Sequence, residues 1–177
     1  MFLDLRRKWE AEDCIYTPAT MQDIELFELQ NEVHLPKDFR SYFLELNGTK
    51  TDGDSQLLEF APLNKLQTWR HLNWTTPPQA PSGFDADKMY IFCDYMISSW
   101  AYAICLDASE SKGGKVTSYG WITEEIIAPS FSAFIDLYLA DDRSIYPPST
   151  TPFVSDPFVP DAPATQPKNP KSWWPRR

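Results

Sequence analysis

The sequence predicts a fold of mixed class, in which helices lie near both ends of the folded part and strands lie between them. Three observations predict it. Apolar residues recur at helical spacing over 21–46 and again over 128–142. The segment 88–107 is rich in aromatic and β-branched residues, which favour strands. From residue 144 onward the chain holds nine of its 16 prolines, which predicts an extended tail outside the folded part.

The first helices are predicted by their apolar spacing and by a start signal. A short amphipathic helix at the start of the chain is indicated by Phe2, Leu5 and Trp9. Thr20 is followed three residues later by Asp23, an arrangement that resembles a capping box. It predicts a helix over 21–31.

The next helix, over 37–46, has both a start and a stop signal. Pro36 suits the first turn, because its missing N–H has no partner to lose there. Asn47 and Gly48 tolerate the left-handed backbone that ends helices. One apolar face is formed by Phe39, Tyr42, Phe43 and Leu46.

The middle of the chain alternates between predicted strands and loops. The segment 56–63 is expected to be a strand and 64–74 a short helix capped by Asn64. A loop follows over 75–87, and a further strand is predicted over 115–122.

The segment 88–107 is expected to form a hairpin that turns at Ser98 and Ser99. A two-residue loop gives the cross-strand pairs Ile97 with Trp100, Tyr95 with Tyr102, and Cys93 with Ile104. In that register Cys93 and Cys105 lie on opposite faces of the sheet, because the faces alternate along a strand. A disulfide between them is therefore excluded.

The last helix is predicted over 128–142, and its aromatic stripe is interpreted as core packing. The chain is expected to divide into a domain over 1–143 and an extended, Pro-rich tail over 144–177. Trp173 and Trp174, near the end of the tail, either dock on the domain or a partner, or are disordered; both alternatives stay open.

The charge of the chain is uneven. The formal net charge is -9, and the tail from residue 144 carries two acids and four bases, a net of +2. The remainder therefore carries -9 - 2 = -11. An acidic body is a poor candidate for binding nucleic acid or anionic membranes, but it suits a basic protein partner. Acidity that merely keeps the protein soluble is an equally good explanation of the charge alone.

The compartment is expected to be the cytoplasm. No stretch is apolar for long enough to span a membrane. Arg6, Arg7 and Lys8 stand where a secretion signal needs its apolar core. The three cysteines are therefore expected to be reduced thiols.

The sequence contains no recognised catalytic or metal-binding pattern. The two histidines, His34 and His71, stand in no spacing typical of a zinc site. No nucleophile elbow, phosphate-binding loop or dinucleotide fingerprint is present. We therefore expect no enzyme activity, no cofactor and no metal.

The order of these elements and the segment 28–48 resemble the SUKH superfamily, the Smi/Knr-type family of bacterial toxin-immunity proteins and fungal cell-wall regulators. Tyr42 is an insertion before the Phe-Leu pair of the motif. The matching residues are Glu28, Leu35, Pro36, Asp38, Phe39, Arg40, Phe43, Leu44, Asn47 and Gly48. The stretch 92–106 and the terminal helix also look like a bacterial branch of this family, so the resemblance covers about residues 1–142.

The resemblance implies an α+β domain in which N-terminal and C-terminal helices pack against a mostly antiparallel sheet. It also implies an immunity-type protein that binds and neutralises a cognate toxin, often a nuclease or another nucleic-acid-modifying enzyme. An acidic body would cover a basic toxin site, which favours fast and specific association. The alternative is a non-catalytic regulatory or scaffolding adaptor of the fungal type, with the tail as a recruiting arm.

The partner-binding surface is predicted from loop acids around an aromatic residue at the hairpin turn. Asp94 is expected to point to solvent while Ile91, Cys93 and Tyr95 turn inward. Trp100 would be the exposed anchor; the competing interpretation is that it caps the hairpin and the acids are ordinary turn residues. The predicted site residues are Asp52, Asp54, Asp85, Asp87, Asp94, Tyr95 and Trp100.

Overall fold

The computed structural model describes residues 2–50, 53–71, 83–96, 100–107, 112–119 and 126–146. The helices within these ranges are α1 (Leu3–Ala11), α2 (Met21–Asn31), α3 (Lys37–Glu45) and α4 (Phe131–Leu139). The strands are β1 (Leu58–Phe60), β2 (Gln67–Thr68), β3 (Met89–Tyr95), β4 (Trp100–Cys105), β5 (Val116–Tyr119) and β6 (Ile126–Ala128). Short 3-10 turns lie at Leu63–Lys65, Trp69–His71, Ala86–Lys88 and Arg143–Ile145.

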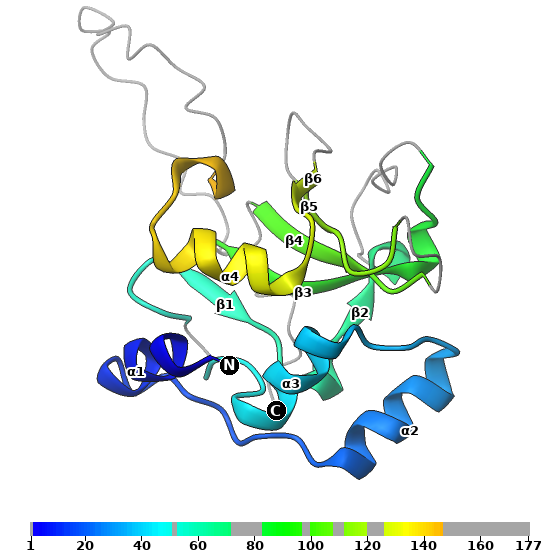
Figure 1. Cartoon of the computed structure of the whole chain (residues 1–177), viewed down its shortest axis with the longest axis horizontal. Coiled ribbons are helices and arrows are strands. Elements are labelled where there is room, and N and C mark those ends of the chain that lie inside the picture. The colour runs from blue at the N-terminus through cyan, green and yellow to red at the C-terminus, as the bar shows by residue number, and fades with distance from the viewer. Residues whose placement is uncertain are drawn as a thin grey trace, which may run out of the picture.

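The strands of the described part join one antiparallel sheet in the order β1-β3-β4-β5-β6, with β2 also paired to β3. Figure 1 shows α4 lying across the sheet, with α1 and α3 beside it. Buried side chains of these three helices, of one sheet face and of Ile24 from α2 form the main core. The α+β fold with helices packed against an antiparallel sheet is confirmed.

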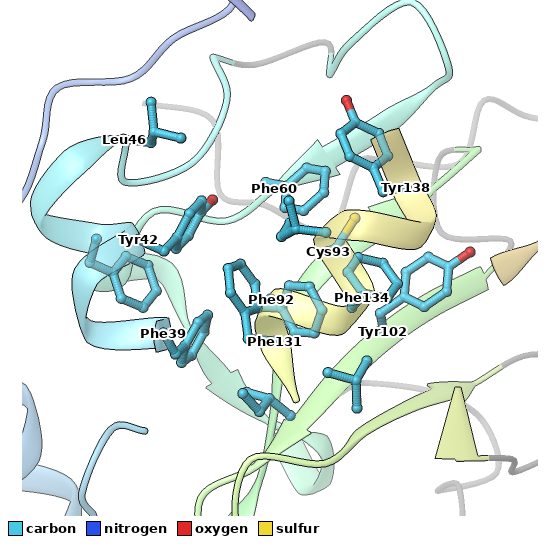
Figure 2. Packing of buried hydrophobic residues seen from close by; sticks show 14 of the residues in the cluster. Phe39, Tyr42, Leu46, Phe60, Phe92, Cys93, Tyr102, Phe131, Phe134 and Tyr138 are labelled. Carbon is cyan, nitrogen blue, oxygen red and sulfur yellow. The ribbon is translucent and has the colours of Figure 1, made fainter. Parts of the chain in front are cut away.

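The main core is built from aromatic rings contributed by both layers, as Figure 2 shows. Phe39 of α3 meets Phe131 of α4 with ring centroids 4.7 Å apart, and Phe92 of β3 at 5.9 Å. Phe92 and Phe131 are themselves 5.3 Å apart in an edge-on arrangement. Such pairs stabilise by about 0.5–1.5 kcal/mol each beyond the area that they bury. This triad therefore fixes how α3 and α4 sit on the sheet.

The predicted start of α2 and the predicted end of α3 are confirmed. The hydroxyl of Thr20 accepts a hydrogen bond from the Asp23 N–H, and the Asp23 carboxylate accepts one from the Thr20 N–H. At the end of α3, Asn47 and Gly48 have φ of 61° and 94°. Pro36 lies at the N-cap, just before the first helical residue. Local signals thus determine the start of α2 and the end of α3.

Polar residues of the family-like motif join α2 to α3. One guanidinium nitrogen of Arg40 lies 2.7 and 2.5 Å from the two carboxylate oxygens of Glu28. The same carboxylate accepts a hydrogen bond from the Leu35 N–H at 2.7 Å. Glu28 therefore satisfies the backbone of the connection between the helices and pairs with the charge on the next helix.

A second set of motif residues joins α3 to the rest of the fold. The Asp38 carboxylate accepts hydrogen bonds from the N–H and hydroxyl of Ser132, in the first turn of α4. The side chain of Asn47 donates to the Thr17 carbonyl and accepts from the Leu63 N–H. These motif positions are structural, since each satisfies backbone or hydroxyl groups of another segment.

Gly48 lies where two backbones approach closely. A Cβ at this position would lie 2.7 Å from the Phe60 carbonyl oxygen and 2.8 Å from the Pro62 nitrogen. Both neighbours are backbone atoms, so they cannot rotate away. Gly48 is thus required by space as well as by its positive φ.

The predicted hairpin is present, but the predicted register is wrong. Tyr95 pairs with Trp100 and Cys93 with Tyr102, and the register then shifts between Ile91 and Cys93. The last cross-strand pair is Tyr95 with Trp100, so the connection between the strands has four residues rather than the predicted two. Ser-Ser is not a favoured two-residue turn. The irregularity also places Ile91 and Cys93 on different faces, against the expectation that both turn inward together.

The second face of the sheet is buried too. Its apolar cluster contains Trp69, Met89, Ile91, Ala101, Ala103 and Cys105, with Phe84 packed against it. Cys93 belongs to the main core instead, so the two cysteines do lie on opposite faces. All three cysteines are free and buried.

Two elements differ from the sequence prediction. The helix predicted over 64–74 is absent from its described residues, which form two 3-10 turns and β2. Pairing with β3 satisfies the backbone there and overrides the helical pattern. Strand β6 was not predicted, because its three residues carry no alternating pattern.

The packed body extends beyond residue 143, the predicted end of the domain. Ile145 is fully buried in the main core, and its carbonyl accepts a hydrogen bond from the Tyr102 hydroxyl. Tyr146 packs against Tyr95 with ring centroids 5.4 Å apart. The first residues assigned to the tail therefore belong to the body, while 147–177 lie outside the described residues.

We predict that Gly48→Ala destabilises the fold more than Gly83→Ala. Both glycines have positive φ, but a Cβ at residue 83 meets no atom within 4 Å. Gly83→Ala should therefore cost about 1–2 kcal/mol for the left-handed backbone. Gly48→Ala should cost roughly 1–3 kcal/mol more for the clash. Denaturant unfolding measures both, and equal losses would contradict the close approach at residue 48.

Candidate partner-binding surface

Among the predicted site residues that the structure describes, Asp85 and Asp87 are the acids that lie on the surface. Asp85 is the N-cap of the 3-10 turn before β3 and Asp87 is the middle residue of that turn; both are exposed. The Asp85 carboxylate accepts a hydrogen bond from the Asp87 N–H at 2.9 Å. The Asp87 carboxylate pairs with Arg70 at 2.5 Å across an exposed contact. These carboxylates can steer a basic partner, although one of them already has a cation beside it.

Asp54 is buried, which corrects the expectation of a surface acid. Its carboxylate accepts hydrogen bonds from the Tyr138 hydroxyl and from the N–H groups of Gln56 and Leu58. Trp9 in turn donates to the Tyr138 oxygen at 3.0 Å. Asp54 thus joins α1, α4 and the turn before β1, a structural role. Its predicted neighbour, Asp52, lies outside the described residues.

The electrostatics of this network are unfavourable for proton transfer near neutral pH. Burial raises the pKa of the Tyr138 hydroxyl, and the hydrogen bond to the Asp54 carboxylate raises it further. The phenol therefore stays protonated and acts as a hydrogen-bond donor. We interpret the network as a tie between elements, because a protonated phenol beside a buried carboxylate satisfies that carboxylate.

Asp94 and Trp100 are also buried, against the prediction. Asp94 is 4% exposed and Trp100 is 5% exposed. Asp94 pairs across the sheet with Ala101 and Glu59, on the face that was expected to be open to solvent. That face is covered, and Trp100 packs in the main core on the other face. The prediction that Trp100 is an exposed aromatic anchor is therefore wrong.

The hairpin end still presents an apolar surface, formed by Leu57, Tyr95, Met96, Asp141 and Tyr146, which we call the hairpin-end surface. Leu57 is 56% exposed, and its carbonyl accepts a hydrogen bond from the Met96 N–H at 3.1 Å. Tyr95 is half-buried against Tyr146. The Tyr146 hydroxyl donates to the Asp141 carboxylate at 2.6 Å. Exposed apolar side chains thus lie beside tyrosines and an acid, a composition typical of recognition surfaces.

The backbone of this surface is strained. Leu57, Met96 and Asp141 have φ of 64°, 54° and 51°, in the left-handed region that large side chains rarely adopt. Such conformations persist only where the surrounding structure enforces them, and they gather at functional sites. Sequence reasoning found only Tyr95 here, because neither periodicity nor composition signals a positive φ at Leu or Met.

The structure does not bring the predicted site residues into one cluster. Asp85 and Asp87 precede β3, whereas Tyr95 is its last residue. A seven-residue strand separates its ends by roughly 20 Å. The exposed acids and the hairpin-end surface are therefore two separate regions at opposite ends of β3.

The described residues offer little for metal or covalent chemistry. Within the described part of the chain, no three potential ligands among His, Cys, Asp and Glu are grouped to hold a metal ion. Burial, followed by the charges of Glu12 and Asp54, raises the pKa of the Cys14 thiol to about 11. Such a thiol stays protonated at neutral pH and is a weak nucleophile. No helix among the described residues is long and apolar enough to cross a membrane.

The comparison with protein families matches the region that contains this architecture. The model of the SMI1 / KNR4 family (SUKH-1) matches residues 18–137, from the segment before α2 into α4. No curated protein matches the chain. The matched region holds the Glu28–Arg40 pair, the Asp38–Ser132 contact and the close approach at Gly48. The chain therefore belongs to the SMI1/KNR4 family (SUKH-1).

Proposed function

We propose that the protein is a cytoplasmic, non-catalytic immunity-type protein that binds and neutralises a cognate protein toxin. The toxin would be a basic enzyme that acts on nucleic acid, such as a nuclease. The family to which the chain belongs includes toxin-immunity proteins. The protein would act by occupying the toxin's surface rather than by any reaction of its own.

The observation that carries this proposal is the charge of the body. Residues 1–143 carry a net charge of -11 by the arithmetic given above. A nucleic-acid enzyme must present positive charge where it binds phosphates. An acidic body is complementary to such a site, and complementary charge speeds association and disfavours other partners. Binding would therefore exclude the nucleic acid from the toxin.

The hairpin-end surface is the proposed centre of contact. Tyr95 and Tyr146 supply rings of limited flexibility, and Leu57 supplies exposed apolar area next to them. Asp85 and Asp87 are proposed as steering charges rather than as part of this centre. Asp54, Asp94 and Trp100 would support the surface from within, because all three are buried.

The function is tested by co-expression with a growth-inhibiting protein encoded beside this chain's gene. We expect this chain to restore growth and to co-purify with that protein, because a blocked toxin cannot reach its substrate. A family member from an unrelated toxin locus is the control. Growth that stays inhibited despite soluble chain would contradict the immunity function and favour an adaptor.

The contact surface is tested with Leu57→Ala and Tyr95→Ala. If these residues anchor the partner, each should weaken binding by about 2 kcal/mol, roughly 30-fold in Kd. Leu3→Ala is the matched control, because Leu3 and Leu57 are both 56% exposed. Affinity is measured by titration calorimetry and folding by thermal unfolding. Folded variants that bind like wild type would place the contact elsewhere.

The steering role is tested with the double variant Asp85→Asn, Asp87→Asn. Asparagine keeps the hydrogen-bonding shape of the turn and removes the charge. We expect slower association with the toxin and little change in dissociation, and raised salt should shrink the difference. Asp136→Asn, which neutralises one exposed carboxylate on α4, is the control. An association rate no lower than that of the control at low salt would rule out steering by this turn.

A further inference from the structure

The outer face of α2 is apolar and exposed. On the inner face of this helix Ile24 is buried and Phe27 packs edge-on against Tyr90, with ring centroids 5.6 Å apart. The opposite face carries Leu26 and Leu29, which are 50% and 78% exposed. The two leucines are one turn apart, so they form one patch. Figure 1 shows α2 at the margin of the molecule.

The same face is acidic. No Lys, Arg or His occurs between residues 20 and 33. The carboxylates of Asp23 and Glu28 are engaged by Thr20 and Arg40, respectively. Glu25 and Glu32 are exposed beside the leucines, and Lys88 donates a hydrogen bond to the backbone carbonyl of Glu32. An occupant of this face must therefore bring apolar side chains together with positive charge.

The chain's own C-terminal segment has this composition. Residues 168–177 contain Trp173 and Trp174, four basic residues and no acid. The described body ends at Tyr146, and 31 residues follow it, since 177 - 146 = 31. At about 3.1 Å per residue for extended proline-rich chain, they could span roughly 90 Å. A domain of this size has a radius of gyration of about 15 Å, so the segment can reach α2.

We propose that residues 168–177 bind the outer face of α2 in the same molecule. Trp173 and Trp174 would cover Leu26 and Leu29, while the basic side chains face Glu25 and Glu32. Tethering favours this contact, because it makes the binding intramolecular and so raises the effective concentration of the segment at α2. A second copy is a poorer occupant, since two α2 faces would bring like charges together. The inference is independent of the proposed toxin and concerns only this chain.

The proposal is tested on the full chain with a nitroxide label at Pro175→Cys. The three native cysteines are buried, so a thiol reagent should label only the new residue. We expect selective loss of the backbone amide signals of Leu26 and Leu29 in nuclear magnetic resonance spectra. The amide of Leu3, an equally apolar and exposed position on α1, should keep its intensity. Equal losses at the three leucines, or none, would overturn the proposal.

Two variants and a salt series separate docking from chance proximity. Trp173→Ala with Trp174→Ala, or Leu29→Ser, should restore the α2 signals, whereas Leu3→Ser should not. Salt at about 1 M, where the Debye length is about 3 Å, should weaken the effect. Losses that survive both substitutions would overturn the proposal. So would losses that appear in isotope-labelled chains mixed with spin-labelled, unlabelled chains, because these report binding to a second copy.

Discussion

The fold depends on the contact among Phe39, Phe92 and Phe131, which joins three segments that are distant in the sequence. One ring comes from the helix after the Leu-Pro pair, one from the central strand and one from the last helix. Because the three positions are far apart in the chain, this contact closes long loops between them, and its favourable energy offsets part of the entropic cost of closing those loops. The polar contacts of Glu28 and Asp38 then orient the helices that bring two of these rings into place.

The use of both sheet faces in packing limits where recognition can occur. The main core covers one face, and the cluster around Trp69 and Met89 lies on the other. Side chains in the middle of β3 and β4 are therefore unable to meet a partner, whatever their charge. Among the described residues, the ends of strands and the outer side of α2 do expose apolar side chains. Those are the places where Leu57, Met96 and Leu29 are exposed.

Some acidic residues of this protein form hydrogen bonds inside the structure and others face solvent, and amino-acid composition does not distinguish the two groups. Asp54 accepts three hydrogen bonds inside the structure, and Asp38 satisfies the first turn of α4. Asp85 and Glu25 instead face solvent. The formal charge of -9 counts all of them alike. Long-range steering depends on the whole sum, whereas affinity depends on the exposed groups near the contact.

The sequence by itself determined the start of α2 and both ends of α3, because capping and turn chemistry are local. Thr20 with Asp23, Pro36, and Asn47 with Gly48 act on backbone groups within a few residues. The family-like motif could also be identified from the sequence, because its residues all lie within the short segment 28–48. The alternation of faces around Cys93 and Cys105 also followed from strand geometry.

Only the tertiary structure decided the hairpin register, the burial of Asp94 and Trp100, and the surface at Leu57 and Met96. A β-irregularity at Ile91 adds one residue to one strand, and no sequence pattern marks it. Asp94 is buried on the sheet face where Trp69 and Phe84, which are distant in the chain, also pack. The left-handed backbone at Leu57 and Met96 is enforced by their neighbours against the local preference of both residues.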